Sequence, residues 1–214
     1  MRDKAIEMAK RLITDSLWKS ANLEGLGTTF QKTEAILANA PTKTTAEEVL
    51  FILNMKHAWQ FLLGNLEYPN SLSIIREFNR IAGNMMFYGN GDIRTLPVSI
   101  GRTKWEPEKP QEGVIISTID ELNSIKDPEL RALKYFCFIA RSQIFIDGNK
   151  RVAQLMANKI LIENDIGIFQ IDIEDLEMFK GLLIEFYESD DDTKIISFMQ
   201  QHCVKRCAVS YDEM

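Results

Sequence analysis

Residues 143–151, Gln-Ile-Phe-Ile-Asp-Gly-Asn-Lys-Arg, bring together side chains that could bind phosphate. Gly148 permits a sharp turn and lets the backbone come close to a ligand. Lys150 and Arg151 would then lie in the first turn of a following helix, where the helix dipole disfavours cations unless an anion is bound. Free backbone N–H groups, the dipole and two cations together form a phosphate cradle. Asp147 could hold a magnesium ion, since Mg²⁺ takes one or two carboxylates plus phosphate oxygens.

The same residues also fit a solvated helix start, in which Asp147 and Asn149 act only as caps. Basic residues near helix starts are common, and short motifs match by chance. From the local pattern alone, phosphate binding and helix capping are equally open.

Two helices are expected to position this turn. Asp127-Pro128-Glu129 is typical of a helix start, and apolar residues at helical spacing follow it through Ala140. Helical spacing returns after residues 147–149. The same periodicity, with a capping signal at Thr45, predicts helices over residues 3–19, 29–40, 45–63, 71–86, from about 118, 173–187 and 192–204. No repeat or long linker divides the chain, so we expect a single domain of the all-α class over residues 1–214.

Residues 89–113 interrupt the helical pattern with a concentration of Gly and Pro. Within them, residues 96–100 and 102–105 have the composition of two short extended arms on either side of Gly101. This pattern predicts a β-hairpin that projects as a flap.

The composition restricts the class of protein. Among 214 residues, 45% are hydrophobic and 26% are charged, as in ordinary globular proteins. Three cysteines, an odd number, favour a reducing compartment. No apolar run approaches the ~18 residues of a membrane span, and the first residues lack the apolar stretch of a signal peptide. We therefore expect a cytoplasmic protein with no membrane partner. The net charge of -6 argues against nucleic acid as a main partner.

Residues 143–151 resemble the signature of the Fic family (Fic/Doc, or Fido), H-x-F-x-[D/E]-G-N-[G/K]-R, from Phe145 onward. Two upstream stretches add to the resemblance. The sequence from Gly91-Asp92-Ile93-Arg94 to Pro107 is similar to the family's flap, and Ser20 to Gly25 matches its inhibitory pattern [S/T]-x-x-x-E-[G/N]. The resemblance implies one Fic-type helical domain, with an inhibitory helix region (1–27), a flap (89–113) and a helix–loop–helix core (128–165).

The resemblance also implies a reaction and its residues. Fic proteins usually transfer AMP from ATP to a hydroxyl of a target protein docked at the flap, a reaction called AMPylation. By position, Asp147 would bind magnesium, and Ser20 and Glu24 would be inhibitory. The phosphates would be held by four consecutive residues, Gly148, Asn149, Lys150 and Arg151. ATP and Mg²⁺ are therefore the expected ligands.

Two positions depart from the family pattern. Gln143 stands where the family has the His that acts as general base, and an amide cannot accept a proton at any useful pH. General base assistance is typically worth ~10²–10⁴ in rate. Gln154 stands where a second Arg normally contacts phosphate and pairs with the inhibitory Glu. A neutral Gln154 could hydrogen-bond Glu24 without an ion pair. The chain's two histidines, His57 and His202, are distant from the motif in sequence.

Two functions therefore remain open. The first is an adenylyltransferase, or a related phosphate-group transferase, with impaired or altered catalysis. The Asn-Lys-Arg form without a second Arg is closer to the family's Doc branch, which is associated with phosphate transfer. The alternative is a non-catalytic regulatory or partner-binding module that binds ATP and magnesium. The catalytic residue, the target protein and the oligomeric state are not specified by the sequence.

Overall fold

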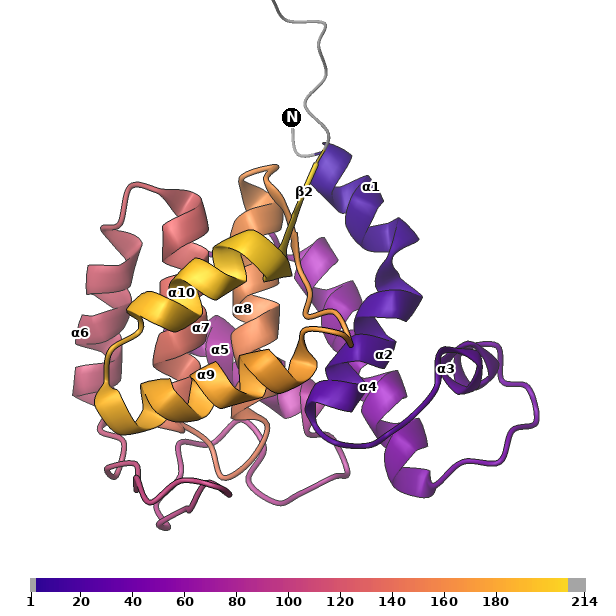
Figure 1. Ribbon diagram of the computed structural model, residues 1–214, viewed down its shortest axis with the longest axis horizontal. Coiled ribbons are helices and arrows are strands. Elements are labelled where there is room, and N and C mark those ends of the chain that lie inside the picture. The colour runs from indigo at the N-terminus through magenta and orange to yellow at the C-terminus, as the bar shows by residue number, and fades with distance from the viewer. Residues whose placement is uncertain (1–2, 208–214) are drawn as a thin grey trace, which may run out of the picture.

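The computed structural model describes residues 3–207, which fold around a central helical hairpin (Figure 1). The hairpin consists of α7 (Pro128–Ser142) and α8 (Asn149–Glu163). Asp127 caps α7 by accepting hydrogen bonds from the backbone of its first turn, as the sequence predicts. Nearly every residue of α8 is buried, so this helix forms the centre of the core.

The N-terminal half of the chain packs along one side of this hairpin. Its helices are α1 (Asp3–Arg11), α2 (Ile13–Leu23), α3 (Phe30–Leu37), α4 (Ala46–Gly64) and α5 (Leu72–Ala82). The single helix expected over residues 3–19 is two helices that meet at Leu12. The capping signal at Thr45 is confirmed: Thr45 and Glu48 form a reciprocal capping box. The backbone N–H of Thr45 helps to lower the pKa of Glu48 to about 2.

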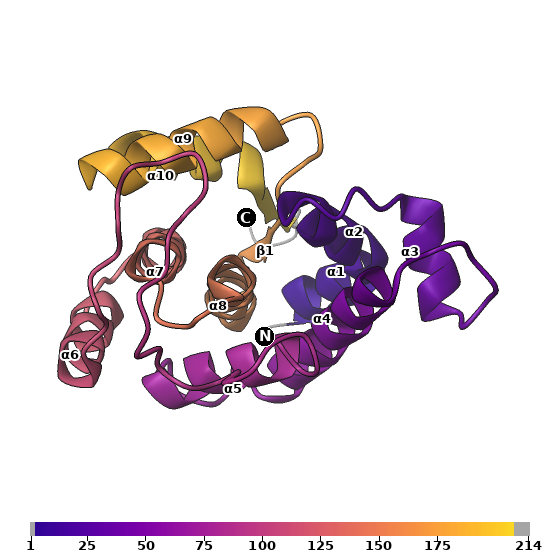
Figure 2. The same cartoon turned by 90° about the horizontal axis from the view of Figure 1, so that it is seen from below.

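The C-terminal part covers the opposite side of the hairpin. It contains α9 (Leu176–Ser189), α10 (Thr193–Phe198) and a π-helical turn (Met199–Cys203), while α6 (Glu112–Asn123) lies beside α7. Seen along α8, the layers separate clearly, with α4 and α5 on one side of it and α9 and α10 on the other (Figure 2). The mainly helical class expected from the sequence is confirmed.

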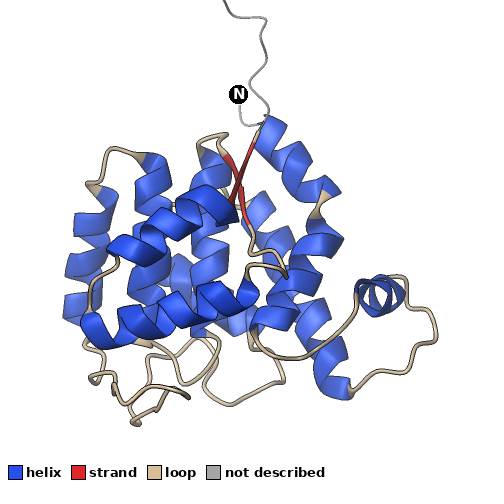
Figure 3. Ribbon diagram, in the orientation of Figure 1, coloured by secondary structure: helices blue, strands red, loops and turns tan. Residues whose placement is uncertain are grey.

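The strands do not lie where the sequence predicts them. Residues 89–113 contain no strand and run as an irregular loop until α6 begins (Figure 3). In the described part of the chain, strands occur only as β1 (Gly167–Phe169) and β2 (Val204–Arg206), which pair antiparallel. The predicted β-hairpin is therefore wrong, although the segment does form a flap-like loop. Its conformation is fixed by side chains rather than by a strand ladder, as described below.

Among residues 3–207, no helix is both long and apolar enough to span a membrane.

Candidate functional site

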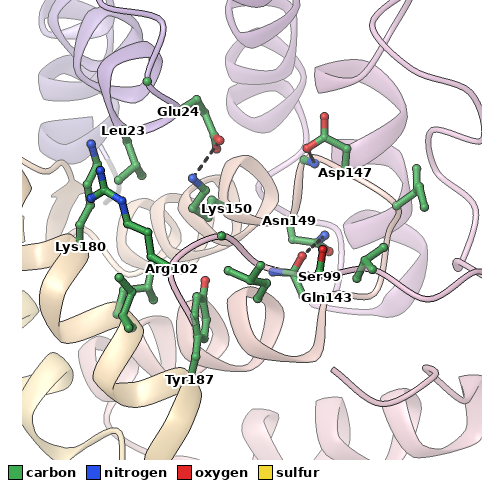
Figure 4. A pocket seen from close by; sticks show the side chains of 18 residues that line it. Leu23, Glu24, Ser99, Arg102, Gln143, Asp147, Asn149, Lys150, Lys180 and Tyr187 are labelled. Carbon is green, nitrogen blue, oxygen red and sulfur yellow. Dashed lines mark hydrogen bonds and ion pairs between the residues drawn. The ribbon is translucent and has the colours of Figure 1, made fainter. Parts of the chain in front are cut away.

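A cavity of about 430 Å³ opens at the N-terminus of α8 (Figure 4). Ligand pockets commonly have volumes of roughly 300–1,000 Å³. Four segments that are distant in sequence contribute its walls: the end of α2, the flap, the turn between α7 and α8, and α9. The lining residues are Leu23, Glu24, Gly25, Val98, Ser99, Ile100, Gly101, Arg102, Gln143, Ile146, Asp147, Gly148, Asn149, Lys150, Lys180, Leu183, Ile184 and Tyr187.

The motif turn, residues 143–151, is held by hydrogen bonds of its own side chains. The Asn149 Oδ1 accepts from the Phe145 N–H at 3.0 Å, and its Nδ2 donates to the Phe145 carbonyl at 2.8 Å. Asn149 is therefore the first residue of α8 rather than its N-cap, and Gly148 takes the cap position. Because the Asn149 side chain is committed to the loop, no side chain caps α8. The first N–H groups of a helix have no intrahelical acceptor, so this helix start remains suited to an anion.

Gly148 is required at its position for two reasons. Its φ of +81° is a left-handed conformation that favours glycine. A Cβ there would also lie 2.9 Å from Nδ2 of Asn79, a fully buried residue of α5. That Nδ2 donates to the Asp147 carbonyl at 2.8 Å, and Oδ1 of Asn79 accepts from the Gly91 N–H at 2.7 Å. Asn79 thus joins the motif turn to the start of the flap, a role that its sequence context did not reveal.

Glu24 and Lys150 meet inside the cavity. Glu24 lies at the C-cap of α2, and its Oε2 is 3.0 Å from Nζ of Lys150 (Figure 4). The second oxygen, Oε1, is buried without a partner in the described part of the chain. The ion pair brings two expected site residues together across more than a hundred residues of sequence. It also means that Lys150, the cavity-lining cation at the start of α8, is already paired with a carboxylate.

Arg151 lies behind the turn instead of facing the cavity. Its guanidinium is almost fully buried, donates to the Ala82 carbonyl at 3.0 Å and pairs with Asp147 at 3.0 Å. The rings of Phe51 and Phe87 flank it at 5.7 and 5.4 Å. Arg151 was expected to hold phosphate, and it is not among the residues that line the cavity. Its role here is to anchor the turn to the end of α5.

Ser20 and Gln154 also lie outside the cavity. Ser20 is buried between α2 and α8, and its hydroxyl has no partner among the described residues. Gln154 donates to the Lys150 carbonyl at 3.3 Å, and no hydrogen bond joins it to Glu24 within residues 3–207. The hydrogen bond that Gln154 could have made to Glu24 is not formed, and Glu24 pairs with Lys150 instead.

Gln143 occupies the position of the family's general base, at the edge of the cavity, but its amide is already engaged. Its Nε2 donates to the Ala140 carbonyl at 2.6 Å, and its Oε1 accepts from Asn149 at 3.0 Å. Neither His57 nor His202 lines the cavity. His202 instead stacks on Phe198 on the C-terminal side of the molecule.

The wall opposite the motif turn contributes residues that the sequence analysis did not identify. Lys180, Leu183, Ile184 and Tyr187 follow the helical spacing i, i+3, i+4, i+7, so one face of α9 lines the cavity. That spacing was visible in the sequence, but nothing in it indicated which site the face would meet. From the flap, Ser99 and Arg102 complete the wall (Figure 4). Burial and the nearby Glu24 carboxylate raise the pKa of Tyr187.

The residues present fit a magnesium ion that depends on a second ligand. In the part of the chain that the structure describes, no three His, Cys, Asp or Glu side chains are grouped to hold a metal alone. Asp147 offers one partly exposed carboxylate at the cavity edge. Magnesium is often bound by one or two carboxylates with the remaining ligands from phosphate and water. Asp147 could therefore hold Mg²⁺ only together with a phosphate ligand.

The fold and the cavity define a class of protein: a helical domain that presents an uncapped central helix to a cavity beneath a loop. A family model described as the Fic/DOC family matches residues 69–161, so this part of the chain is similar to that family. The match includes the motif turn and the flap.

Solved structures share this fold. A Fic domain containing signaling protein from Bacteroides thetaiotaomicron VPI-5482 has a TM-score of 0.76 and 19% identity, with 93% of this chain and 85% of that chain covered. Fic-1 from C. elegans has a TM-score of 0.77 and 21% identity, with 93% of this chain and 62% of that chain covered. A Fic family protein from Desulfovibrio desulfuricans G20 has a TM-score of 0.74 and 14% identity, with 94% of this chain and 62% of that chain covered. This chain therefore spans less than two thirds of the last two. A comparison with curated protein sequences gives no match.

Proposed function

We propose that the cavity binds ATP, or a related nucleotide, together with magnesium. The observation that carries this proposal is the start of α8, which has no side-chain cap and places Lys150 in a cavity of suitable volume. Backbone N–H groups and the Lys150 ammonium are the donors that phosphate requires. Bound magnesium would neutralise phosphate charge, with Asp147 as its protein ligand.

The other walls suit the remainder of a nucleotide. Leu183, Ile184 and Tyr187 of α9 offer an apolar and aromatic surface for a base, while Arg102 and Lys180 add positive charge. Two acidic residues, Glu24 and Asp147, face three cations around the cavity, so its formal charge favours an anionic ligand.

Glu24 competes with the phosphates for Lys150. A carboxylate 3.0 Å from the ammonium must move or lose its partner before a phosphate can take the same place. Two negative groups at that distance from one cation also repel each other. We infer that Glu24 restrains nucleotide binding, which is the inhibitory role implied by its sequence pattern.

The proposed reaction is transfer of AMP or phosphate from the nucleotide to a hydroxyl of a target protein docked at the flap. The hydroxyl oxygen forms a bond to phosphorus, and the bond to the leaving group breaks, which is pyrophosphate in AMP transfer and ADP in phosphate transfer. The hydroxyl proton passes to solvent. Gln143 cannot take that proton. Positioning and charge stabilisation provide most of phosphoryl-transfer catalysis, so transfer is expected to be slow rather than abolished.

A second function, a non-catalytic nucleotide-binding module, is favoured by a specific observation. Both ends of the Gln143 amide are used to hold the turn together, so this residue maintains the binding site without offering a group to the reaction. Such a module would change its flap surface on binding ATP and recognise a partner through it.

Calorimetry of ATP binding, with and without Mg²⁺, tests the nucleotide binding that both functions require. Lys150→Gln is expected to weaken ATP binding about tenfold or more, because it removes a charge-assisted contact. Asp147→Asn keeps an acceptor for the turn and should reduce the dependence on Mg²⁺. Lys126→Gln removes an exposed lysine that does not line the cavity and serves as the matched control. Undiminished ATP binding in Lys150→Gln would overturn the assignment of the phosphate site.

A further inference from the structure

A second pocket, separate from the nucleotide cavity, lies on the N-terminal helices. Its volume is about 400 Å³, and α1, α2, α3 and α4 all contribute to it. We call it the α2–α4 pocket. Its lining residues are Lys10, Ile13, Leu17, Leu37, Lys56, Trp59, Gln60 and Leu63. Five of these eight side chains are apolar, and none of the eight is acidic.

The two lysines of this pocket carry uncompensated charge. Lys10 and Lys56 form no ion pair within residues 3–207, as is also true of exposed lysines such as Lys43 and Lys126, but these two lie beside an apolar surface. The whole chain has a net charge of -6, so unpaired cations beside an apolar surface are not a consequence of its overall composition. Their charge favours an anion at this position.

Trp59 supplies a third polar group without a partner. Its indole N–H donates to no group in the described part of the chain and is not buried away from solvent, so it is accessible as a donor. This donor and the two lysines belong to one pocket whose other lining side chains, apart from Gln60, are apolar.

From this combination we propose that the α2–α4 pocket binds an aliphatic carboxylate of the fatty-acid type. The acyl chain lies against Ile13, Leu17 and Leu63, and the carboxylate meets the lysine ammonium groups. Charge complementarity selects the anionic end, and the apolar lining selects the chain.

This ligand would contact the helix that carries Glu24. Leu17 of α2 lies in the α2–α4 pocket, while Leu23 and Glu24 at the end of the same helix line the nucleotide cavity. The two sites share one rigid element. The carboxylate site itself does not depend on nucleotide binding, so each can be tested independently.

Titration of the full chain with decanoate, below its micellar concentration, tests the proposal. Calorimetry gives the affinity, and tryptophan fluorescence, compared with Trp59→Phe, shows whether the ligand reaches this pocket. Decan-1-ol is the neutral counterpart of the same chain length. A Lys10→Gln/Lys56→Gln variant removes the anion partners, and Lys43→Gln/Lys126→Gln removes two exposed lysines elsewhere as the matched control.

The expected result is saturable binding of decanoate that the Lys10/Lys56 variant weakens by about tenfold or more, with the control unchanged. Decan-1-ol should bind more weakly than decanoate. Equal binding of the alcohol, equal weakening by both lysine variants, or no saturable binding would overturn the proposal. Tighter binding of an acidic amphipathic peptide, in competition with decanoate, would reassign the pocket to a protein partner.

Discussion

The motif turn and the flap both line the cavity at the start of α8, but they are stabilised in different ways. Residues 143–151 are tied by their own side chains, with Asn149 bonded to both backbone groups of Phe145. In the flap, residues 95–110 make no backbone-to-backbone hydrogen bond to themselves or to any other described segment. The turn is therefore built by local hydrogen bonds, whereas the flap relies on distant side chains.

Arg94 is the principal anchor of the flap. Its buried guanidinium donates to the carbonyls of Gln143 at 2.6 Å, Leu96 at 2.9 Å and Glu108 at 2.5 Å. Burial without a carboxylate lowers the pKa of this group. Arg94 joins both arms of the flap to the motif turn at one end, and beyond it the loop is held by side-chain contacts with α9, such as that of Thr103 with Glu188. The comparison indicates that a turn held by its own hydrogen bonds lies on one side of the cavity and a loop held by side-chain contacts on the other.

The largest expected effect is a gain of activity when the missing base is restored in the turn. Gln143→His places an imidazole at the family's position while the phosphate site stays in place. Transfer from ATP to a protein hydroxyl should rise about 10²-fold or more. The gained activity should fall as the pH drops through ~6.5, because a protonated imidazole cannot accept a proton. ATP labelled separately on the α- and γ-phosphates identifies the transferred group.

Gln143→Ala is the control, since it removes the amide without supplying a base and should not gain activity. A folded, ATP-binding Gln143→His protein that modifies neither itself nor any protein in a cell extract would favour the non-catalytic module.

The second effect concerns stability and tests the local construction of the turn. Asn149→Ala leaves the N–H and carbonyl of Phe145 buried without partners, so unfolding free energy should fall by about 2–4 kcal/mol. Urea denaturation measures the change. Asn164→Ala, which removes one partly buried bond to the Ile160 carbonyl, should cost about 1 kcal/mol. Equal losses in the two variants would mean that the turn has no special dependence on Asn149.

The sequence predicted the turn better than the flap for the same physical reason. Helix caps and helical periodicity depend on near neighbours, so Asp127, Thr45 and the hairpin around Gly148 could be located from local patterns. The flap conformation depends on Arg94 reaching carbonyls as far away as Gln143, and no local pattern encodes that contact.

Contacts over long sequence distances also explain the errors within the site. Lys150 and Arg151 are adjacent and chemically alike, yet one faces Glu24 in the cavity and the other is buried against Ala82. Their different environments arise from the rotation of α8 against α2 and α5, which the sequence alone does not specify. Lys159 is a similar case: it is fully buried because Glu163 and Asn70 bind its ammonium.

A smaller effect is expected where α2 meets the turn. Glu24→Gln removes the carboxylate charge but keeps the shape of the side chain, so ATP no longer competes for Lys150. ATP affinity should increase about tenfold, as expected for one charge-assisted contact. In a Lys150→Gln background the same change should have little effect, because the two residues act through one ion pair. Glu174→Gln, an exposed site, is the matched control; an equal gain there would indicate a general charge effect.

The smallest expected effect is a change in proteolysis that is confined to the flap and leaves the motif turn unchanged. Trp105 stacks on Tyr187 at 5.8 Å, and the Arg141 guanidinium lies 4.6 Å from its ring, so this contact holds the far arm of the flap to α9. Trp105→Ala removes interactions worth about 1–2 kcal/mol together, which should speed trypsin cleavage after Arg102 about tenfold. Cleavage after Lys150 in the same protein should not change, because the motif turn keeps its own hydrogen bonds. Equal acceleration at both positions would show that the flap and the turn loosen together.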